Sequence, residues 1–314
     1  MSDQNSKTVL ILGANGRFGR NAANAFANAG WTVFSHTRMG TNLSDDVAGI
    51  HTPFDIQNVD DFHATAAKCN VIVNALHPPY PTWSTELPKM TKVVIDAART
   101  SGATIMIAGN IYNFGVAMPP LLNESTPHAA RTKKGKLRID MEKSYKTAAD
   151  QGVQTIILRC GDFIERKKTG NWFDSHLTGK LKRGKFAYPG KQNIKHAWAY
   201  LPDSGRAIVE LAEIRDNLET FEDIPFEGSS LTAIELRDAI SIQMNRKMRI
   251  TGFPWFAINA MSLFSPLMRE LLEMRYLWDI EHSVDGAKLA RLLPNFKPTS
   301  TREIMKDILA DHMN

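Results

Sequence analysis

Cysteine is scarce in this chain, with two residues, Cys69 and Cys160, in a sequence of 314. Both lie in apolar, strand-like stretches and they are far apart. Neither a disulfide framework nor the ligand spacing of a metal site follows from them. We therefore expect no bound metal.

Long apolar runs are also lacking, since no stretch reaches the length of about 18 residues that a membrane span needs. The segment Phe253–Trp278 is rich in apolar residues, but Pro254, Pro266 and several charges interrupt it. The first residues, Met1–Lys7, are polar and lack the apolar centre of a signal peptide. These absences predict a cytoplasmic protein with no membrane partner.

The charge is only mildly basic, with a net charge of +5 and a pI near 9.1. The densest basic runs are Arg131–Arg138 and Arg166–Lys168. Both are short, and no aromatic residues alternate with them as in nucleic-acid-binding segments. They favour a solvated face or a pocket for an anionic ligand, and we expect no nucleic-acid partner.

Short apolar runs alternate with helical patterns through the first half of the chain. The strand candidates are Val9–Leu12, Thr32–Ser35, Val71–Val73, Thr104–Ile107 and Thr155–Leu158. The helix candidates are Asn21–Ala29, Val59–Lys68, Leu87–Thr100 and Leu137–Ala149. This order predicts an α/β fold with a doubly wound parallel sheet.

The second half is less regular. A loop is expected over Gly170–Pro189, helices over Asp203–Arg215 and Leu231–Met244, and a proline-broken segment over Ser283–His312. We expect a nucleotide-binding Rossmann domain over 1–165, to which 191–215 returns. Segments 166–190 and 216–314 would form a smaller C-terminal substrate lobe.

Three glycines, Gly13, Gly16 and Gly19, follow the first strand and open the first helix. Glycine allows a tight turn, a close approach of backbone to pyrophosphate, and close packing of helix on strand. The helix N-terminus then offers free N–H groups and a positive dipole. A glycine-rich turn without a ligand is the alternative, but the strand–turn–helix context favours a dinucleotide site.

The end of the second strand selects between the two nicotinamide dinucleotides. It reads Ser35-His-Thr-Arg38, and no acidic residue occurs before Asp45. An acidic residue there would bind the ribose hydroxyls of NAD, whereas a basic one pairs with the 2′-phosphate of NADP. Arg38, helped by Arg17, can bind phosphate with a planar guanidinium. NADP(H) is therefore preferred over NAD.

The spacing Gly-x-x-Gly-x-x-Gly resembles the extended short-chain dehydrogenase/reductase superfamily, the NAD-dependent epimerases and dehydratases. Asp55-Ile56, Asn74-Ala-Leu-His77, Asn110-Ile-Tyr-Asn-Phe-Gly115, Glu124 with Pro127, Leu158-Arg-Cys-Gly-Asp-Phe163 and Tyr200-Leu-Pro-Asp203 match later landmarks. The resemblance implies cofactor contacts from Gly13, Asn15, Gly16, Arg17, Phe18, Gly19, Thr37, Arg38, Asp55, Ala75, Leu76, His77, Arg138 and Cys160. It also implies a dimer formed through Leu87–Thr100 and Leu137–Ala149, which we favour slightly over a monomer.

The catalytic set departs from that family, in which a tyrosine moves the proton and a lysine four residues later assists it. Tyr145 is followed by Ala149 at that distance. Counting along the chain places the pair on Lys134 and Arg138, and the family's serine on Asn110. Another register places the pair on Thr132 and Lys136, so the tyrosine is absent in both.

Substitutes for that tyrosine can be proposed. Lys134 could be the general acid if it were buried beside Arg138, because burial and like charge favour a neutral amine. Arg138 would bind ribose or phosphate, and Tyr112 is a second candidate acid. Alternatively, Lys134, Lys136 and Arg138 are surface charges and Tyr112 is a packed aromatic.

Aromatic residues are expected on loops that overhang the nicotinamide end, and they suggest an apolar or ring-bearing substrate. They are Tyr80, Trp83, Trp172, Phe173, His196 and Trp198. Packing in the core of the small lobe explains them equally well. The sequence thus predicts an oxidoreductase or epimerase acting on a carbonyl or hydroxyl group. The alternative is a non-catalytic NADP(H) sensor that signals through a partner.

Overall fold

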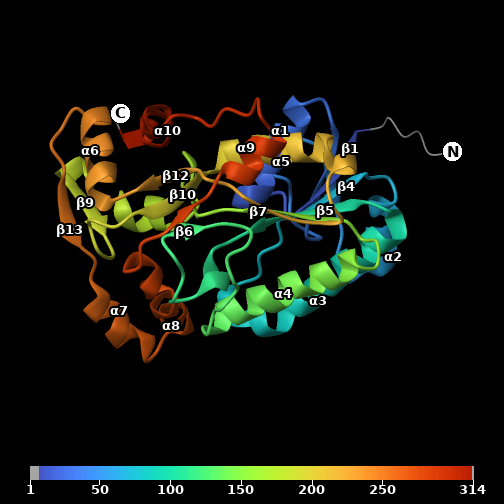
Figure 1. The fold of residues 1–314 in the computed structure, drawn as a ribbon, viewed down its shortest axis with the longest axis horizontal. Coiled ribbons are helices and arrows are strands. Elements are labelled where there is room, and N and C mark those ends of the chain that lie inside the picture. Colours follow the sequence, from blue (N-terminus) through green and yellow to red (C-terminus); the bar gives the residue numbers. More distant parts are fainter. Residues whose placement is uncertain (1–6, 313–314) are drawn as a thin grey trace.

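A seven-stranded sheet forms the centre of the computed structural model, which describes residues 7–312 (Figure 1). Its order is β11-β7-β5-β4-β1-β2-β3, and every pairing in it is parallel. The strands are β1 (Thr8–Leu12), β2 (Thr32–Thr37), β3 (Ile50–Pro53), β4 (Val71–Asn74), β5 (Thr104–Gly109), β7 (Thr155–Arg159) and β11 (Phe221–Pro225). The expected α/β fold and its five strand candidates are confirmed.

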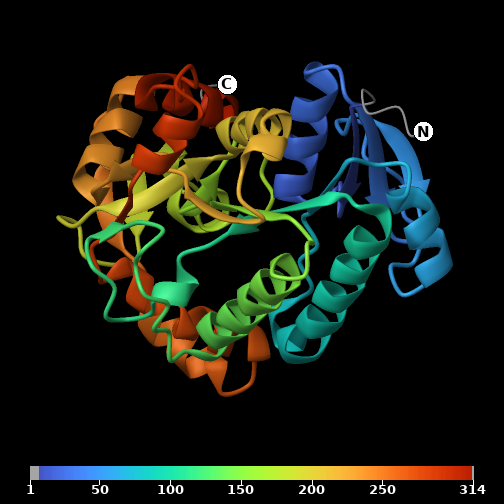
Figure 2. The same ribbon diagram turned by 45° about the vertical axis from the view of Figure 1, so that its right-hand side comes forward.

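Helices cover both faces of this sheet, as Figure 2 shows. One face carries α1 (Arg17–Asn28) and α5 (Leu201–Glu213), which pack against each other. The other carries α2 (Val59–Ala66), α3 (Trp83–Ser101) and α4 (Lys133–Ala149). The central strands are buried on both faces, which explains their continuous apolar sequences.

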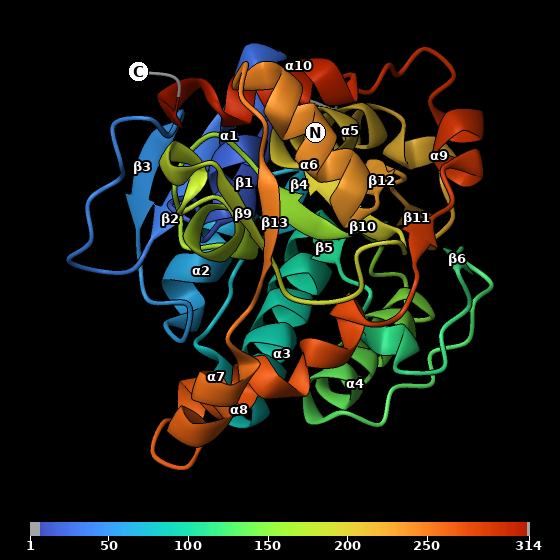
Figure 3. The same cartoon turned by 90° about the vertical axis from the view of Figure 1, so that its left-hand side faces the viewer.

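A second core lies beyond the carboxyl ends of the sheet strands and forms the smaller lobe. A three-stranded sheet joins β8 (Asp162–Ile164), β10 (His196–Tyr200) and β12 (Ser229–Leu231). Parallel pairs join β9 (Lys185–Tyr188) to β13 (Arg249–Gly252), and β6 (Leu121–Leu122) to β14 (Ser283–Val284). The helices here are α6 (Ala233–Gln243), α7 (Trp255–Ser262), α8 (Pro266–Glu273) and α10 (Thr301–Ile308). In Figure 3, α7 and α8 form the lowest part of the molecule, next to α3 and α4.

The division of the chain between sheet and lobe differs from the expected one at two strands. Segment 216–314 was expected in the lobe, but its β11 pairs with β7, and α9 (Ala287–Leu292) packs on β11. Segment 191–215 was expected to return to the sheet, but its β10 pairs with β8 and β12, and only α5 packs on the large domain. Acidic residues interrupt β11, which hides its strand pattern in the sequence.

Some element boundaries also differ. The segment Gly170–Pro189, expected to be a loop, contains a π-helical turn at Phe173–Leu177 and strand β9. Helix α4 begins four residues before the expected start, because the Thr132 side chain caps it by accepting from the Gly135 N–H. Within residues 7–312, no helix combines the length and apolar character needed to cross a membrane.

Candidate functional site

The turn between β1 and α1 requires its glycines. Gly13 has a φ of +73°, and a Cβ there would lie 3.0 Å from the Ala75 carbonyl oxygen. A Cβ on Gly16 would lie 3.1 Å from the Gly13 oxygen, and one on Gly19 would collide with that same oxygen. The turn therefore brings bare backbone and the N-terminus of α1 to the carboxyl edge of the sheet, as a phosphate cradle requires.

His36 supports this turn from β2, a role that no sequence pattern indicates. The Gly13 N–H donates to His36 Nδ1 at 3.3 Å, and Nε2 lies 3.0 Å from the Phe54 carbonyl oxygen. Burial lowers the pKa of His36, so that the neutral ring is favoured. A neutral ring with its proton on Nε2 satisfies both contacts. The turn thus depends on the protonation state of a buried histidine.

The end of β2 leaves one cation unpaired. Thr37 is buried and its hydroxyl donates to the Thr41 carbonyl, whereas Arg38 is exposed. Within residues 7–312, the Arg38 side chain forms no hydrogen bond or ion pair. Asn15 joins the adjoining loop to the glycine turn by donating to the Asn42 carbonyl and accepting from the Ser44 N–H.

Two arginines face His77 at the end of β4. His77 is accessible to solvent, yet protein surrounds it, including the rings of Tyr80 and Trp83. Burial, followed by the positive charges of Arg138 and Arg17, lowers the pKa of His77 to about 4. The charges of Arg138 and Arg17 thus act near the segment that follows β4, beside the glycine turn, which suits an anionic ligand.

The inward face of α4 carries four polar residues at helical spacing, namely Lys134, Arg138, Glu142 and Tyr145. Arg138 donates from Nη2 to the Ala108 carbonyl at 2.8 Å. Its buried Nε has no partner within residues 7–312, and burial lowers the pKa of Arg138. A guanidinium remains charged at neutral pH even so. Arg138 therefore presents an unused donor beside the carboxyl edge.

Lys134 is buried, but α8 holds its charge. Its Nζ contacts the Glu270 carboxylate and lies 2.9 Å from Glu273 Oε2. The same ammonium lies 5.1 Å from the ring centroid of Tyr80. The general-acid hypothesis required Lys134 to be buried beside a like charge. The structure places two carboxylates around it instead. The alternative, that Lys134 is an exposed charge on the helix surface, is also wrong, because Lys134 is buried.

Asn110 and Tyr112 line the cleft after β5. The Asn110 side-chain oxygen accepts from the Tyr112 N–H at 3.0 Å, and the Tyr112 hydroxyl lies 3.4 Å from that of Tyr80. Burial raises the pKa of Tyr112 well above its usual value, with contributions from Tyr80 and Asp162. Tyr112 is therefore a hydrogen-bond donor at neutral pH, and in the free chain its hydroxyl is a weaker acid than that of an exposed tyrosine.

Asp162, at the start of β8, is a site residue that the sequence analysis did not select. His196 Nε2 lies 2.9 Å from Asp162 Oδ2, and the charge of this carboxylate also raises the pKa values of Tyr112 and Tyr188. Its side chain is 20% exposed, so it reaches the cleft. One signal was available, because Asp162 follows the apolar strand β7 at the edge where ligands bind in such folds.

Most of the aromatic residues expected on overhanging loops belong to the core instead. Trp83 is the first residue of α3 and is 2% exposed, and Trp198 lies on β10 and is 1% exposed. His196 and Phe173 are buried as well, and Trp172 packs in an aromatic cluster with Phe253, Trp255 and Trp278. The loop placement was wrong because large aromatic rings remove the most apolar area from water when they pack in a core.

Two further expected cofactor residues are placed as follows. Cys160 is buried below the edge, where burial raises the pKa of its thiol to about 12, so it is an unreactive thiol. Asp55 is exposed after β3 and accepts the Gln57 N–H.

A buried ion-pair network holds the main chain of Asn110 in place. Arg159, at the end of β7, pairs with Glu142 and Asp223 and donates to the Asn110 carbonyl at 2.6 Å. His128, Glu142 and Asp223 bring potential metal ligands close together. The Arg159 guanidinium already pairs with both carboxylates, so this cluster positions β5 and α4.

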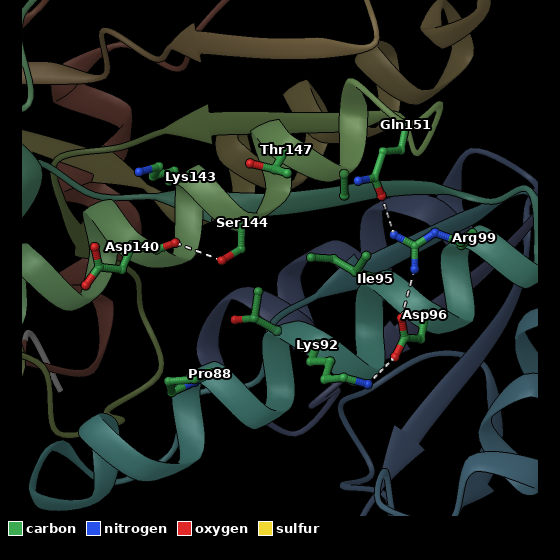
Figure 4. Close-up of a pocket in the computed structure, with 12 residues that line it drawn as sticks. Pro88, Lys92, Ile95, Asp96, Arg99, Asp140, Lys143, Ser144, Thr147 and Gln151 are labelled. Carbon is green, nitrogen blue, oxygen red and sulfur yellow. Dashed lines mark hydrogen bonds and ion pairs between the residues drawn. The ribbon is translucent and has the colours of Figure 1, made fainter.

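A groove of about 550 Å³ lies elsewhere, between α3 and α4 on the side away from the sheet (Figure 4). Most of the residues that line it are of polar types, although apolar atoms make up much of its walls. An ion-pair chain joins Lys92, Asp96 and Arg99 and continues to Gln151. It is separate from the glycine turn and carries none of the cleft residues described above.

The sheet order, the glycine turn and the cleft together define a Rossmann protein with the fold of the extended short-chain dehydrogenases/reductases.

No sequence profile of a known family and no curated protein matches this chain. Solved structures do match its fold. UDP-glucose 4-epimerase from Brucella ovis in complex with NAD is 15% identical, with a TM-score of 0.74, over 98% of each chain. UDP-N-acetylglucosamine 4-epimerase from Bacillus cereus is 14% identical, with a TM-score of 0.75, over 98% of this chain and 100% of that one. L-Threonine dehydrogenase from Clostridium difficile is 17% identical, with a TM-score of 0.76, over 98% of this chain and 99% of that one.

Proposed function

We propose that this chain is an NADP(H)-dependent oxidoreductase or epimerase that acts on a carbonyl or hydroxyl group of a small molecule in the cytoplasm. The observation that carries the proposal is the cleft beside the glycine turn. There Gly13 packs against the Ala75 carbonyl, the charges of Arg138 and Arg17 act on His77, and the buried Nε of Arg138 lacks a partner within residues 7–312.

The residues present fit a nicotinamide dinucleotide. Gly13, Gly16 and the first turn of α1 would bind the pyrophosphate, and Arg17 would add a cation. Arg138 would hold the ribose or phosphate through its unused donor. The remaining contacts proposed for the cofactor are Asn15, Phe18, Gly19, Thr37, Asp55, Ala75, Leu76, His77 and Cys160. Arg38, exposed and unpaired within residues 7–312, would bind a 2′-phosphate, which supports NADP(H) although structures of similar fold hold NAD.

When bound, the cofactor would supply or accept a hydride. The chain must then move a proton at the substrate oxygen, and the donor we propose is the Tyr112 hydroxyl, which lies 3.4 Å from the Tyr80 hydroxyl. The substrate complex would have to lower the pKa of Tyr112, because burial in the free chain raises it. Asp162, partly exposed and paired with His196, can accept a proton or a hydrogen bond from a hydroxyl. The N–H groups of the Asn110 side-chain amide can orient the oxygen, since within residues 7–312 only its side-chain oxygen forms a hydrogen bond. Lys134 would act by holding α8 against the cleft.

The ring of Tyr80, unlike most of the other aromatic rings, is not in the core and lies beside Tyr112 and His77. A substrate ring would stack on it, which supports an apolar or ring-bearing substrate. Proteins of the same fold include epimerases whose names specify UDP-sugars.

A second candidate function is an NADP(H) sensor that binds the cofactor without turnover. The absence of the family's tyrosine and the pairing of Lys134 with two glutamates favour it. Such a protein would need the cleft but no proton donor.

Turnover distinguishes the two functions. Purified protein is incubated with NADPH and a panel of ring-bearing aldehydes and ketones, and loss of NADPH absorbance is followed. We expect oxidation of NADPH with at least one compound, and Tyr112→Phe should lower kcat at least about a hundredfold, as the loss of a general acid does. Tyr200→Phe, which removes a hydroxyl that donates to Asp307 in the lobe, is the matched control. Tight NADPH binding without turnover on any compound would support the sensor instead.

A further inference from the structure

The hairpin of α7 and α8 carries a concentration of exposed apolar side chains. Phe256 is 82% exposed, Leu263 is 74% exposed and Phe264 is 88% exposed, and Met261 and Leu267 are about half exposed. These five are a large share of the twelve exposed large hydrophobic residues found within residues 7–312, yet they occupy a segment of twelve positions. Apolar side chains gathered in this way mark an interaction surface.

The base of the hairpin is firmly held, so the exposure is not a sign of an unsupported segment. Trp255 donates from Nε1 to the Pro189 carbonyl at 2.6 Å, and Arg269 donates to the Ser262 carbonyl at 3.1 Å. Lys134 of α4 pairs with both glutamates of α8. The fold therefore presents the apolar tip in a defined position, at the lower end of the molecule in Figure 3.

Unpaired cations lie beside the hairpin. Arg131, Lys133 and Lys136 flank Lys134 at the start of α4, and all three are exposed. Within residues 7–312, their side chains form no ion pair or hydrogen bond. Glu270 and Glu273, the nearest acidic residues of α8, are already occupied by Lys134. The surface next to the C-terminal half of α8, at the side of the hairpin, therefore carries unpaired positive charge.

The shape of the tip decides what can cover it. Residues that line a groove for a protein partner are partly covered by the groove walls, but Phe256 and Phe264 are almost fully bare. Bare side chains on a projecting hairpin suit a deformable apolar phase, and phenylalanine and leucine next to lysine and arginine are typical of segments that lie in a lipid interface. Anionic headgroups complement the adjacent cations.

We propose that the α7–α8 hairpin inserts its tip into an anionic lipid surface, with Arg131, Lys133 and Lys136 contacting the headgroups. This peripheral contact requires no membrane-spanning helix, so it revises the expectation of no membrane partner, which considered spans alone. The contact would hold the chain at the membrane with its hairpin inserted, and it does not depend on the proposed enzymatic function.

Co-sedimentation with sucrose-loaded vesicles tests the proposal. We expect the full chain to sediment with vesicles of phosphatidylcholine and phosphatidylserine at 3:1, and much less with phosphatidylcholine alone. The double variant Phe256→Ser with Phe264→Ser should weaken binding at least about tenfold, because it removes two inserting rings. The triple variant Arg131→Gln, Lys133→Gln and Lys136→Gln should weaken binding to the anionic vesicles at least about tenfold and abolish their advantage.

Ile242→Ser is the matched control, since Ile242 is 78% exposed on α6 and lies outside the hairpin; it should bind like the parent. All substituted side chains are exposed, and unchanged circular dichroism and thermal unfolding will show that the variants fold. No sedimentation of the parent with either vesicle, or equal binding by the double variant, would overturn the proposal. So would a parent that is oligomeric without vesicles and becomes monomeric in the double variant, because the tip would then join copies of the chain.

Discussion

Lys134 and Glu273 join the two parts of the molecule: the Lys134 ammonium lies 2.9 Å from Glu273 Oε2, and the Lys134 backbone N–H donates to Glu273 Oε1 at the same distance. One residue of α4 thus holds α8 through both its side chain and its main chain. Glu270 adds a second carboxylate. The residue that the sequence suggested as a general acid is also a structural link beside the cleft.

Replacing Lys134 by methionine should lower the free energy of unfolding by about 2 kcal/mol or more, because two carboxylates are left without their cation. Urea unfolding of Lys134→Met measures the change. The triple variant Lys134→Met, Glu270→Gln and Glu273→Gln should recover much of it. If the triple variant also recovers turnover, Lys134 acts through structure. Lost turnover in a variant of restored stability would make Lys134 the proton donor after all.

Arg138→Met should weaken NADPH binding about tenfold or more, because it removes the donor that faces the cleft. Isothermal titration measures the affinity. Lys143→Met, on the outer side of the same helix where α4 lines the groove, is the matched control and should bind like the parent. An unchanged affinity in Arg138→Met would remove this residue from the cofactor site.

NADPH should bind at least about tenfold more tightly than NADH, roughly 1.4 kcal/mol, because Arg38 is free to pair with a 2′-phosphate. Titrating both cofactors into the parent and into Arg38→Ala tests this, and the variant should lose the preference while it keeps its NADH affinity. Equal affinities in the parent would contradict the assignment of NADP(H).

The chain should form a dimer through α3 and α4, whose outer faces line the groove shown in Figure 4. Sedimentation equilibrium at micromolar concentration should give twice the chain mass of 35.1 kDa. Ser144→Glu with Thr147→Glu places two charges in that groove and should yield monomers. Because several charged residues line the groove, the preference is slight, and a parent that sediments as a monomer would count against this interface.

Acid should destabilise the fold partly through His282, whose pKa is lowered to about 3 by burial and by His196. Below pH 6.5 the unfolded chain binds a proton at this histidine and the folded chain does not, so stability falls as the pH drops toward 3. Between pH 7.5 and pH 5 this contribution is about 2 kcal/mol. His282→Gln should lose that much less stability over the interval in urea unfolding. His63→Gln on α2 serves as control, and an identical pH slope in the parent and in His282→Gln would contradict the assignment.

The sequence alone determined five of the seven strands of the sheet and the glycine turn of this protein, because both depend on local patterns. Buried parallel strands such as Val9–Leu12 are continuous apolar runs, and a phosphate-binding turn needs glycine at short fixed spacings. The position of Arg38 after β2 follows from the same order. What only the tertiary structure decided are contacts between distant segments. The sequence does not reveal that Lys134 pairs with Glu270 and Glu273. These two residues lie 136 and 139 positions further along the chain. Nor does it reveal that Asp162 reaches Tyr112, or that Trp83 and Trp198 lie in the core, because a side chain's partners depend on how the helices and the lobe pack and not on its neighbours in the chain.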